Sequence, residues 1–121
     1  MRRRAENLGH AAHLLADAAV PARAAGVWHL YGDPFEAWVE SHLDELLDAP
    51  IPPEPPGSSA ALVESLAVAA SRFPADTRAT PLASWRAWRP RVALGESALR
   101  EQALALVPLA RAHLRALFRA A

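Results

Sequence analysis

The sequence predicts an all-α protein, an irregular antiparallel bundle of about four main helices joined by short connecting helices. Composition is the first reason. Alanine occupies 29 of the 121 positions, whereas isoleucine occurs once and valine, threonine and tyrosine are sparse. Because strands favour β-branched and aromatic residues, this composition argues against a sheet. Periodicity is the second reason, since apolar residues recur at the spacing of amphipathic helices in several segments.

The length and the absence of cysteine narrow the class of protein further. A chain of 121 residues suits one helical domain over residues 1–121. Without cysteine, a disulfide framework, thiol catalysis and cysteine-ligated metal sites are excluded. No apolar run approaches the roughly 20 residues that cross a bilayer, and polar residues interrupt the stretch that a secretory signal would need. We therefore expect a cytoplasmic protein without membrane contact and without a cofactor.

The first predicted helix covers residues 5–19. Its apolar side chains, among them Leu8 and Leu15, share one face, and its polar side chains share the opposite face. Pro21 suits the first turn of a second, short helix. This helix is expected to end near Gly32, because glycine readily takes the left-handed conformation of a C-cap.

The clearest helix signal covers residues 33–49. Asp33 is a favoured N-cap, Pro34 is a favoured first residue, and Glu36 stands at the capping-box position. An apolar stripe follows at helical spacing and consists of Phe35, Trp38, Val39, His42, Leu43, Leu46 and Leu47. We expect one continuous helix here. Because His42 lies within the stripe, we expect its ring to bond a backbone carbonyl or a carboxylate.

Prolines separate this helix from the next one. Residues 49–57 form a proline-rich connector of polyproline type, which is extended and fairly stiff. It is expected to join two helices of the same domain, because neither half of the chain is large enough for a good core. The helix after it starts at Ser58 or Ser59 and ends at Pro74.

Two further helices complete the prediction. A brief helix opens at Thr80–Pro81 and carries Trp85 and Trp88. The last helix runs from about Glu96 to the end of the chain, with an apolar face at helical spacing. Pro108 should kink this helix, since proline lacks an amide N–H and clashes with the preceding turn.

The net charge of zero conceals a division of the chain into three blocks. Residues 1–29 hold four arginines and two acids, a net charge of +2. Residues 30–71 hold eight acids and no arginine, a net charge of −8. Residues 72–121 hold nine arginines and three acids, a net charge of +6. This segregation is the most informative functional feature of the sequence.

Two rows of like charge follow from this layout. The acidic row, spaced four residues apart in the helix predicted over 33–49, consists of Glu36, Glu40, Asp44 and Asp48. The basic row in the last helix consists of Arg111, Arg115 and Arg119, with Arg100 on the same side. The rows can pair within one bundle or remain solvated. Alternatively, one row can meet a protein partner or a second copy of the chain, where charge sets orientation and partner choice.

A metal site is the first alternative. Glu6, His10, His13 and Asp17 line one face of the first predicted helix, and two ligands four residues apart on a helix can chelate a divalent ion. His42 could complete the site only if the first helix turned its polar face inward, which would expose its leucines. We therefore assign no metal ligand, and a metal-dependent helical-bundle enzyme that uses these histidines and Asp17 stays an alternative.

The segment 85–91 interleaves aromatic and cationic side chains. Such groups stack on bases and bind phosphates, and they are also enriched at protein interfaces. Because the chain is neutral overall, long-range attraction to nucleic acid is weak. A nucleic-acid-binding protein that uses Arg86, Arg89 and Arg91 is the second alternative.

The function expected from the sequence is therefore non-enzymatic. The chain has no glycine-rich phosphate loop and no G-x-S-x-G motif. We expect a helical protein-interaction or assembly module that self-associates or binds a protein partner through its segregated charges. The residues expected to bind the partner are Glu36, Glu40, Asp44, Trp85, Arg86, Trp88, Arg89, Arg111, Arg115 and Arg119.

Overall fold

The computed structural model describes residues 2–24, 33–77 and 92–120. These residues form helices and no strand, which confirms the predicted all-α class. The helices are α1 (Arg2–Ala18), α2 (Pro21–Ala24), α3 (Pro34–Ser41), α4 (Leu43–Asp48), α5 (Ser59–Ser71) and α6 (Glu96–Ala120). The brief helix predicted around Trp85 and Trp88 lies outside the described residues, as does the predicted end of the second helix.

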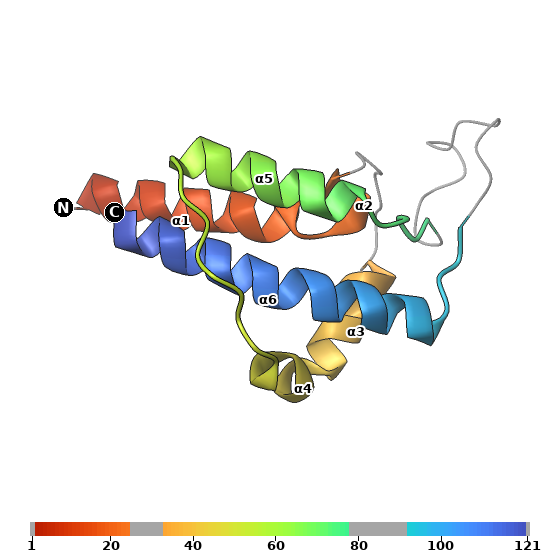
Figure 1. Ribbon diagram of the computed structural model, residues 1–121. Coiled ribbons are helices and arrows are strands. Elements are labelled where there is room, and N and C mark those ends of the chain that lie inside the picture. The colour runs from red at the N-terminus through yellow and green to blue at the C-terminus, as the bar shows by residue number, and fades with distance from the viewer. Residues whose placement is uncertain (1, 25–32, 78–91, 121) are drawn as a thin grey trace.

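The three long helices α1, α5 and α6 lie side by side and contact one another (Figure 1). The start of α1 and the end of α6 lie at the same end of the bundle. α3 and α4 pack against α6 farther from that end. The connector between α4 and α5 returns across the bundle to the start of α5. The acidic helices α3 and α4 therefore lie apart from the end that carries the last arginines of α6.

Two clusters of buried apolar side chains form the core. One cluster lies where α3 and α4 pack on α6 and consists of Val20, Ala22, Phe35, Trp38, Leu46, Ala70, Leu99, Ala103 and Leu106. The other joins α1, α5 and α6 and consists of Leu15, Ala19, Leu62, Leu66 and Leu117. Full burial of one such leucine contributes roughly 1.5–3 kcal/mol. The apolar face predicted for the first helix is confirmed, since Leu15 is buried and Leu8 packs against the second cluster.

The helix predicted over 33–49 is divided at His42, so the expectation of one continuous helix is wrong. In an uninterrupted helix the Trp38 carbonyl would accept a hydrogen bond from the His42 backbone N–H. Instead, this carbonyl oxygen lies 2.9 Å from Ser41 Oγ and 2.8 Å from His42 Nδ1. The His42 N–H donates to the Val39 carbonyl in a tighter turn. The expected contact of the His42 ring with a backbone carbonyl is confirmed, and this contact helps to end α3.

The predicted helix caps are present at α3 and α5. The Asp33 carboxylate accepts hydrogen bonds from the backbone N–H groups of Phe35, at 2.7 Å, and Glu36, at 3.2 Å. Ser58 caps α5 through a hydrogen bond from the Ala61 N–H to its Oγ. α6 continues as a helix on both sides of Pro108, whose ring is buried. Among the described helices, none is long and apolar enough to cross a membrane.

Candidate functional site

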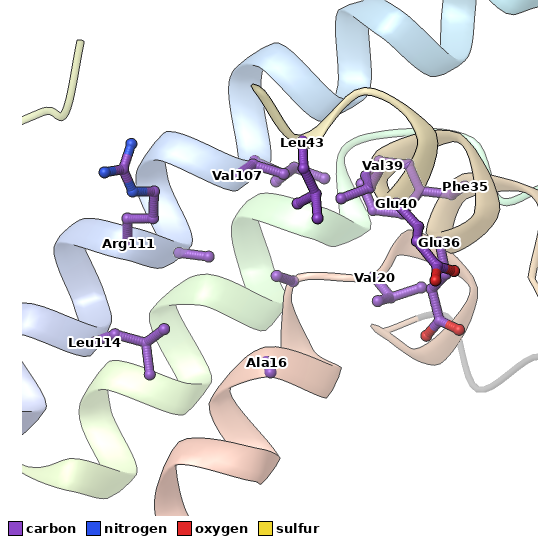
Figure 2. A pocket seen from close by; sticks show the side chains of 13 residues that line it. Ala16, Val20, Phe35, Glu36, Val39, Glu40, Leu43, Val107, Arg111 and Leu114 are labelled. Atoms are coloured by element: carbon purple, nitrogen blue, oxygen red, sulfur yellow. The ribbon is translucent and has the colours of Figure 1, made fainter. Parts of the chain in front are cut away.

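An apolar groove of about 360 Å³ opens between the end of α1, α3 and α6 (Figure 2). It is lined by Ala16, Ala19, Val20, Phe35, Glu36, Val39, Glu40, Leu43, Leu106, Val107, Ala110, Arg111 and Leu114. Leu43, the first residue of α4, is 44% exposed in its wall. A volume of this size matches the pockets that receive small ligands or protein side chains. We call this surface the apolar groove.

Three charged residues border the apolar groove. Glu36 and Glu40 lie on its α3 side, and Arg111 projects from α6 (Figure 2). Arg23 Nε donates a hydrogen bond to Glu36 Oε1 at 3.0 Å and lies 3.5 Å from Asp17 Oδ1. This hydrogen bond to Glu36 raises the pKa of Arg23 above its usual value, which keeps the guanidinium charged. Glu40 is exposed and forms no ion pair with a described residue.

Three arginines of α6 connect this helix to α4 and to the connector. The contacts are Arg100 with the Glu45 carboxylate, Arg111 with the Leu47 carbonyl and Arg119 with the Glu54 carboxylate. In the described part of the chain, no ion pair joins the acidic row to the basic row. Arg115 is exposed and has no ion-pair partner among these residues. Charges of both signs therefore stay available on the surface.

The break at His42 also divides the acidic row. Glu36 and Glu40 belong to α3, whereas Asp44 and Asp48 belong to α4. The four acids share one face only if the helix is continuous. The acids of α3 thus border the apolar groove, and the acids of α4 do not line it.

The structure does not bring the alternative metal ligands together. His10 and His13 are exposed on α1, and His13 Nε2 lies 3.5 Å from Asp17 Oδ2. His42 lies in the turn between α3 and α4, where its Nδ1 faces the Trp38 carbonyl. Within the described ranges, no group of three histidine, aspartate or glutamate side chains is placed to hold a metal ion.

Ser65 and His113 form a polar contact that the sequence did not indicate. His113 is buried, and its Nδ1 lies 2.8 Å from the Leu109 carbonyl oxygen, so we assign the proton to Nδ1. Its Nε2 lies 2.9 Å from Ser65 Oγ on α5. The two residues are 48 positions apart in sequence, and no local motif relates them. Neither lines the apolar groove, so we interpret the contact as a link between α5 and α6.

The aromatic and cationic segment lies outside the described residues. This applies to Trp85, Arg86, Trp88, Arg89 and Arg91, whose expected roles stay predictions.

No protein-family model, curated protein or solved structure matches the chain. The candidate site therefore stands on its geometry, which is an apolar groove with two carboxylates on one side and a guanidinium on another.

Proposed function

We propose that this protein is a non-enzymatic interaction module that receives an apolar side chain of a protein segment in the apolar groove. The observation that carries the proposal is the groove itself, whose lining is apolar except for Glu36, Glu40 and Arg111. Protein interfaces commonly combine an apolar anchor in a pocket with a polar rim that fixes orientation. The groove offers both parts.

The charges of the rim favour a partner segment with basic residues beside its apolar anchor. Glu40 is exposed and has no described ion-pair partner, whereas Arg111 already donates to the Leu47 carbonyl. The carboxylate is therefore the more available of the two charges. An arginine next to the anchor would gain a charge-assisted contact with Glu40.

The experiment is a selection of displayed random peptides on the immobilised wild-type protein. We expect enriched peptides to carry a large apolar residue next to an arginine. Leu43→Glu places a charge in the wall of the groove and should weaken their binding by more than about ten-fold, as for an interface anchor. Val68→Glu is the matched control, because Val68 is similarly exposed, at 48% against 44%, but lies on α5 outside the groove.

The peptide selection has outcomes that support the proposal and outcomes that contradict it. Peptides that bind the wild type and Val68→Glu equally well, but Leu43→Glu weakly, support the proposal. A selection that enriches no peptide contradicts it, and so do peptides that bind Leu43→Glu as tightly as the wild type. Circular dichroism of both variants verifies that each one is folded.

A further inference from the structure

We infer that the segment bound by this protein is an amphipathic helix with opposite charges at its two ends, which lies along α6 from the apolar groove to Phe118. The inference rests on the proposed function and adds the form and the charge pattern of the partner. One apolar side chain of the partner enters the apolar groove, and a second one packs on Phe118. An arginine beside the first anchor faces Glu40, and an acidic residue beside the second anchor faces Arg115.

The exposed surface of α1 and α6 continues beyond the apolar groove. Phe118 is 55% exposed although it is a large aromatic residue. It follows Leu114 by four residues and Val107 by eleven, so it lies on the face of α6 that lines the groove. On α1, Gly9 precedes the groove residue Ala16 by seven positions, and a Cβ added at Gly9 would meet no described atom within 4 Å outside the adjoining backbone. We call the surface formed by Gly9, Ala16, Leu114 and Phe118 the α1–α6 seam.

A helix suits the α1–α6 seam better than an extended segment. α1 and α6 lie side by side (Figure 1), and Leu8 and Leu117 line one surface pocket, which places the neighbouring Gly9 and Phe118 at the same level. An extended segment needs a strand edge for its backbone N–H and C=O groups, and the described part of the chain contains no strand. A helix satisfies these groups internally. At a rise of 1.5 Å per residue, Phe118 lies about 12 Å beyond Ala110 in the groove, so the two anchors of a partner helix stand about two turns apart.

Unpaired charges of opposite sign lie at the two ends of this surface. Glu40 lines the groove on α3, and Figure 2 shows Leu114 at the other end of the groove. Arg115 directly follows Leu114 and precedes Phe118 by three residues, about one helical turn. Glu40 and Arg115 are both exposed, and neither has an ion-pair partner among the described residues. A partner with charges of one sign would be repelled at one of the two ends, so charge complementarity requires a basic end at Glu40 and an acidic end at Arg115.

The test is fluorescence anisotropy of three designed helical peptides, each with two leucines seven positions apart. The first peptide carries an arginine beside one leucine and a glutamate beside the other. The second carries arginine at both places, and the third carries glutamate at both. We expect the wild type to bind the first peptide most tightly, by about two- to five-fold, as for an exposed ion pair. A proline in the middle of the first peptide should abolish binding, because it breaks the helix.

Variants of the protein identify the residues that face the peptide. Arg115→Glu should prefer the second peptide, and Glu40→Arg should prefer the third, because each exchange restores opposite charges. Phe118→Asp should weaken binding of the first peptide by more than about ten-fold, as for an interface anchor. Leu14→Asp is the matched control. Leu14 is similarly exposed, at 57% against 55%, but lies two positions from Ala16 and therefore on a different side of α1.

The failure of this inference can be distinguished from the failure of the proposed function. Binding of the first peptide that depends on Leu43 but is unchanged by Phe118→Asp and Arg115→Glu overturns the inference and leaves the proposed function intact. The inference also fails if the wild type binds none of the three peptides, does not discriminate between them, or tolerates the proline. Binding that is unaffected by Leu43→Glu contradicts the proposed function itself. Circular dichroism verifies that each variant is folded.

Discussion

The imidazole of His42 stacks on the indole of Trp38, with ring centroids 3.8 Å apart and ring planes 8° from parallel. This pair stands at the turn between α3 and α4. The turn places Leu43 in the wall of the apolar groove and Leu46 in the core. The shape of this wall thus depends on the contact between two neighbouring rings.

His42→Ala should lower the free energy of unfolding by about 1–2 kcal/mol, because it removes the ring stack and the contact with the Trp38 carbonyl. Urea denaturation followed by circular dichroism measures the change. His10→Ala is the control, since His10 is exposed on α1 and should leave stability unchanged. Equal stability of the two variants would show that the stacked pair does not stabilise the turn.

Asp33→Ala should lower the free energy of unfolding by about 1 kcal/mol, the usual contribution of an N-cap. The carboxylate accepts hydrogen bonds from two backbone N–H groups at the start of α3. Asp33→Asn should retain most of the stability, because an amide oxygen also caps helices. Thermal unfolding of the three proteins provides the comparison. If Asp33→Asn lost as much stability as Asp33→Ala, the N-cap hydrogen bonds would not be the reason for the loss.

Much of the fold could be predicted from local patterns. Asp33, Ser58 and the apolar periodicity of α1 and α6 act over short distances in the sequence, and the structure has these elements in place. The division at His42 could not be predicted in the same way. The apolar stripe continues through it, and only the competition of the Ser41 and His42 side chains for the Trp38 carbonyl shows why the helix ends.

Ser65→Ala should destabilise the protein by about 0.5–1.5 kcal/mol, because it leaves the buried His113 Nε2 without its hydrogen-bond partner. Ser71→Ala is a matched control, since Ser71 is likewise an exposed serine of α5, and its hydroxyl donates to the Val68 carbonyl of its own helix. Urea denaturation should show a smaller change for Ser71→Ala. Identical changes would indicate that the contact between α5 and α6 contributes nothing.

The double variant Glu40→Arg/Asp44→Arg should leave the unfolding midpoint at low protein concentration nearly unchanged. Neither acid forms an ion pair with a described residue. Glu36→Arg should cost up to about 1 kcal/mol, because it replaces the partner of Arg23 by a like charge. Circular dichroism during thermal unfolding measures the stability of both variants. A large destabilisation by the double variant would mean that the acidic and basic rows pair within one chain.

The candidate site could be predicted only in part. The sequence singled out Glu36, Glu40 and Arg111 by their charge, and the structure places all three at the apolar groove. The groove itself depends on how α1, α3 and α6 pack, which no local pattern specifies. The sequence places Val39 and Leu43 together on one apolar stripe of a continuous helix. The turn at His42 leaves Leu43 exposed in the groove wall.

The reaction rate of a thiol placed in the apolar groove tests most directly whether a protein segment binds in the groove. The chain has no cysteine, so Leu43→Cys and Val68→Cys each carry one thiol, at sites of similar exposure. The rate of reaction with a soluble thiol reagent is measured with and without a selected peptide. We predict that Leu43→Cys reacts several-fold more slowly when the peptide is present, while Val68→Cys is unaffected. A Leu43→Cys rate that the peptide does not change would contradict the proposed role of the groove.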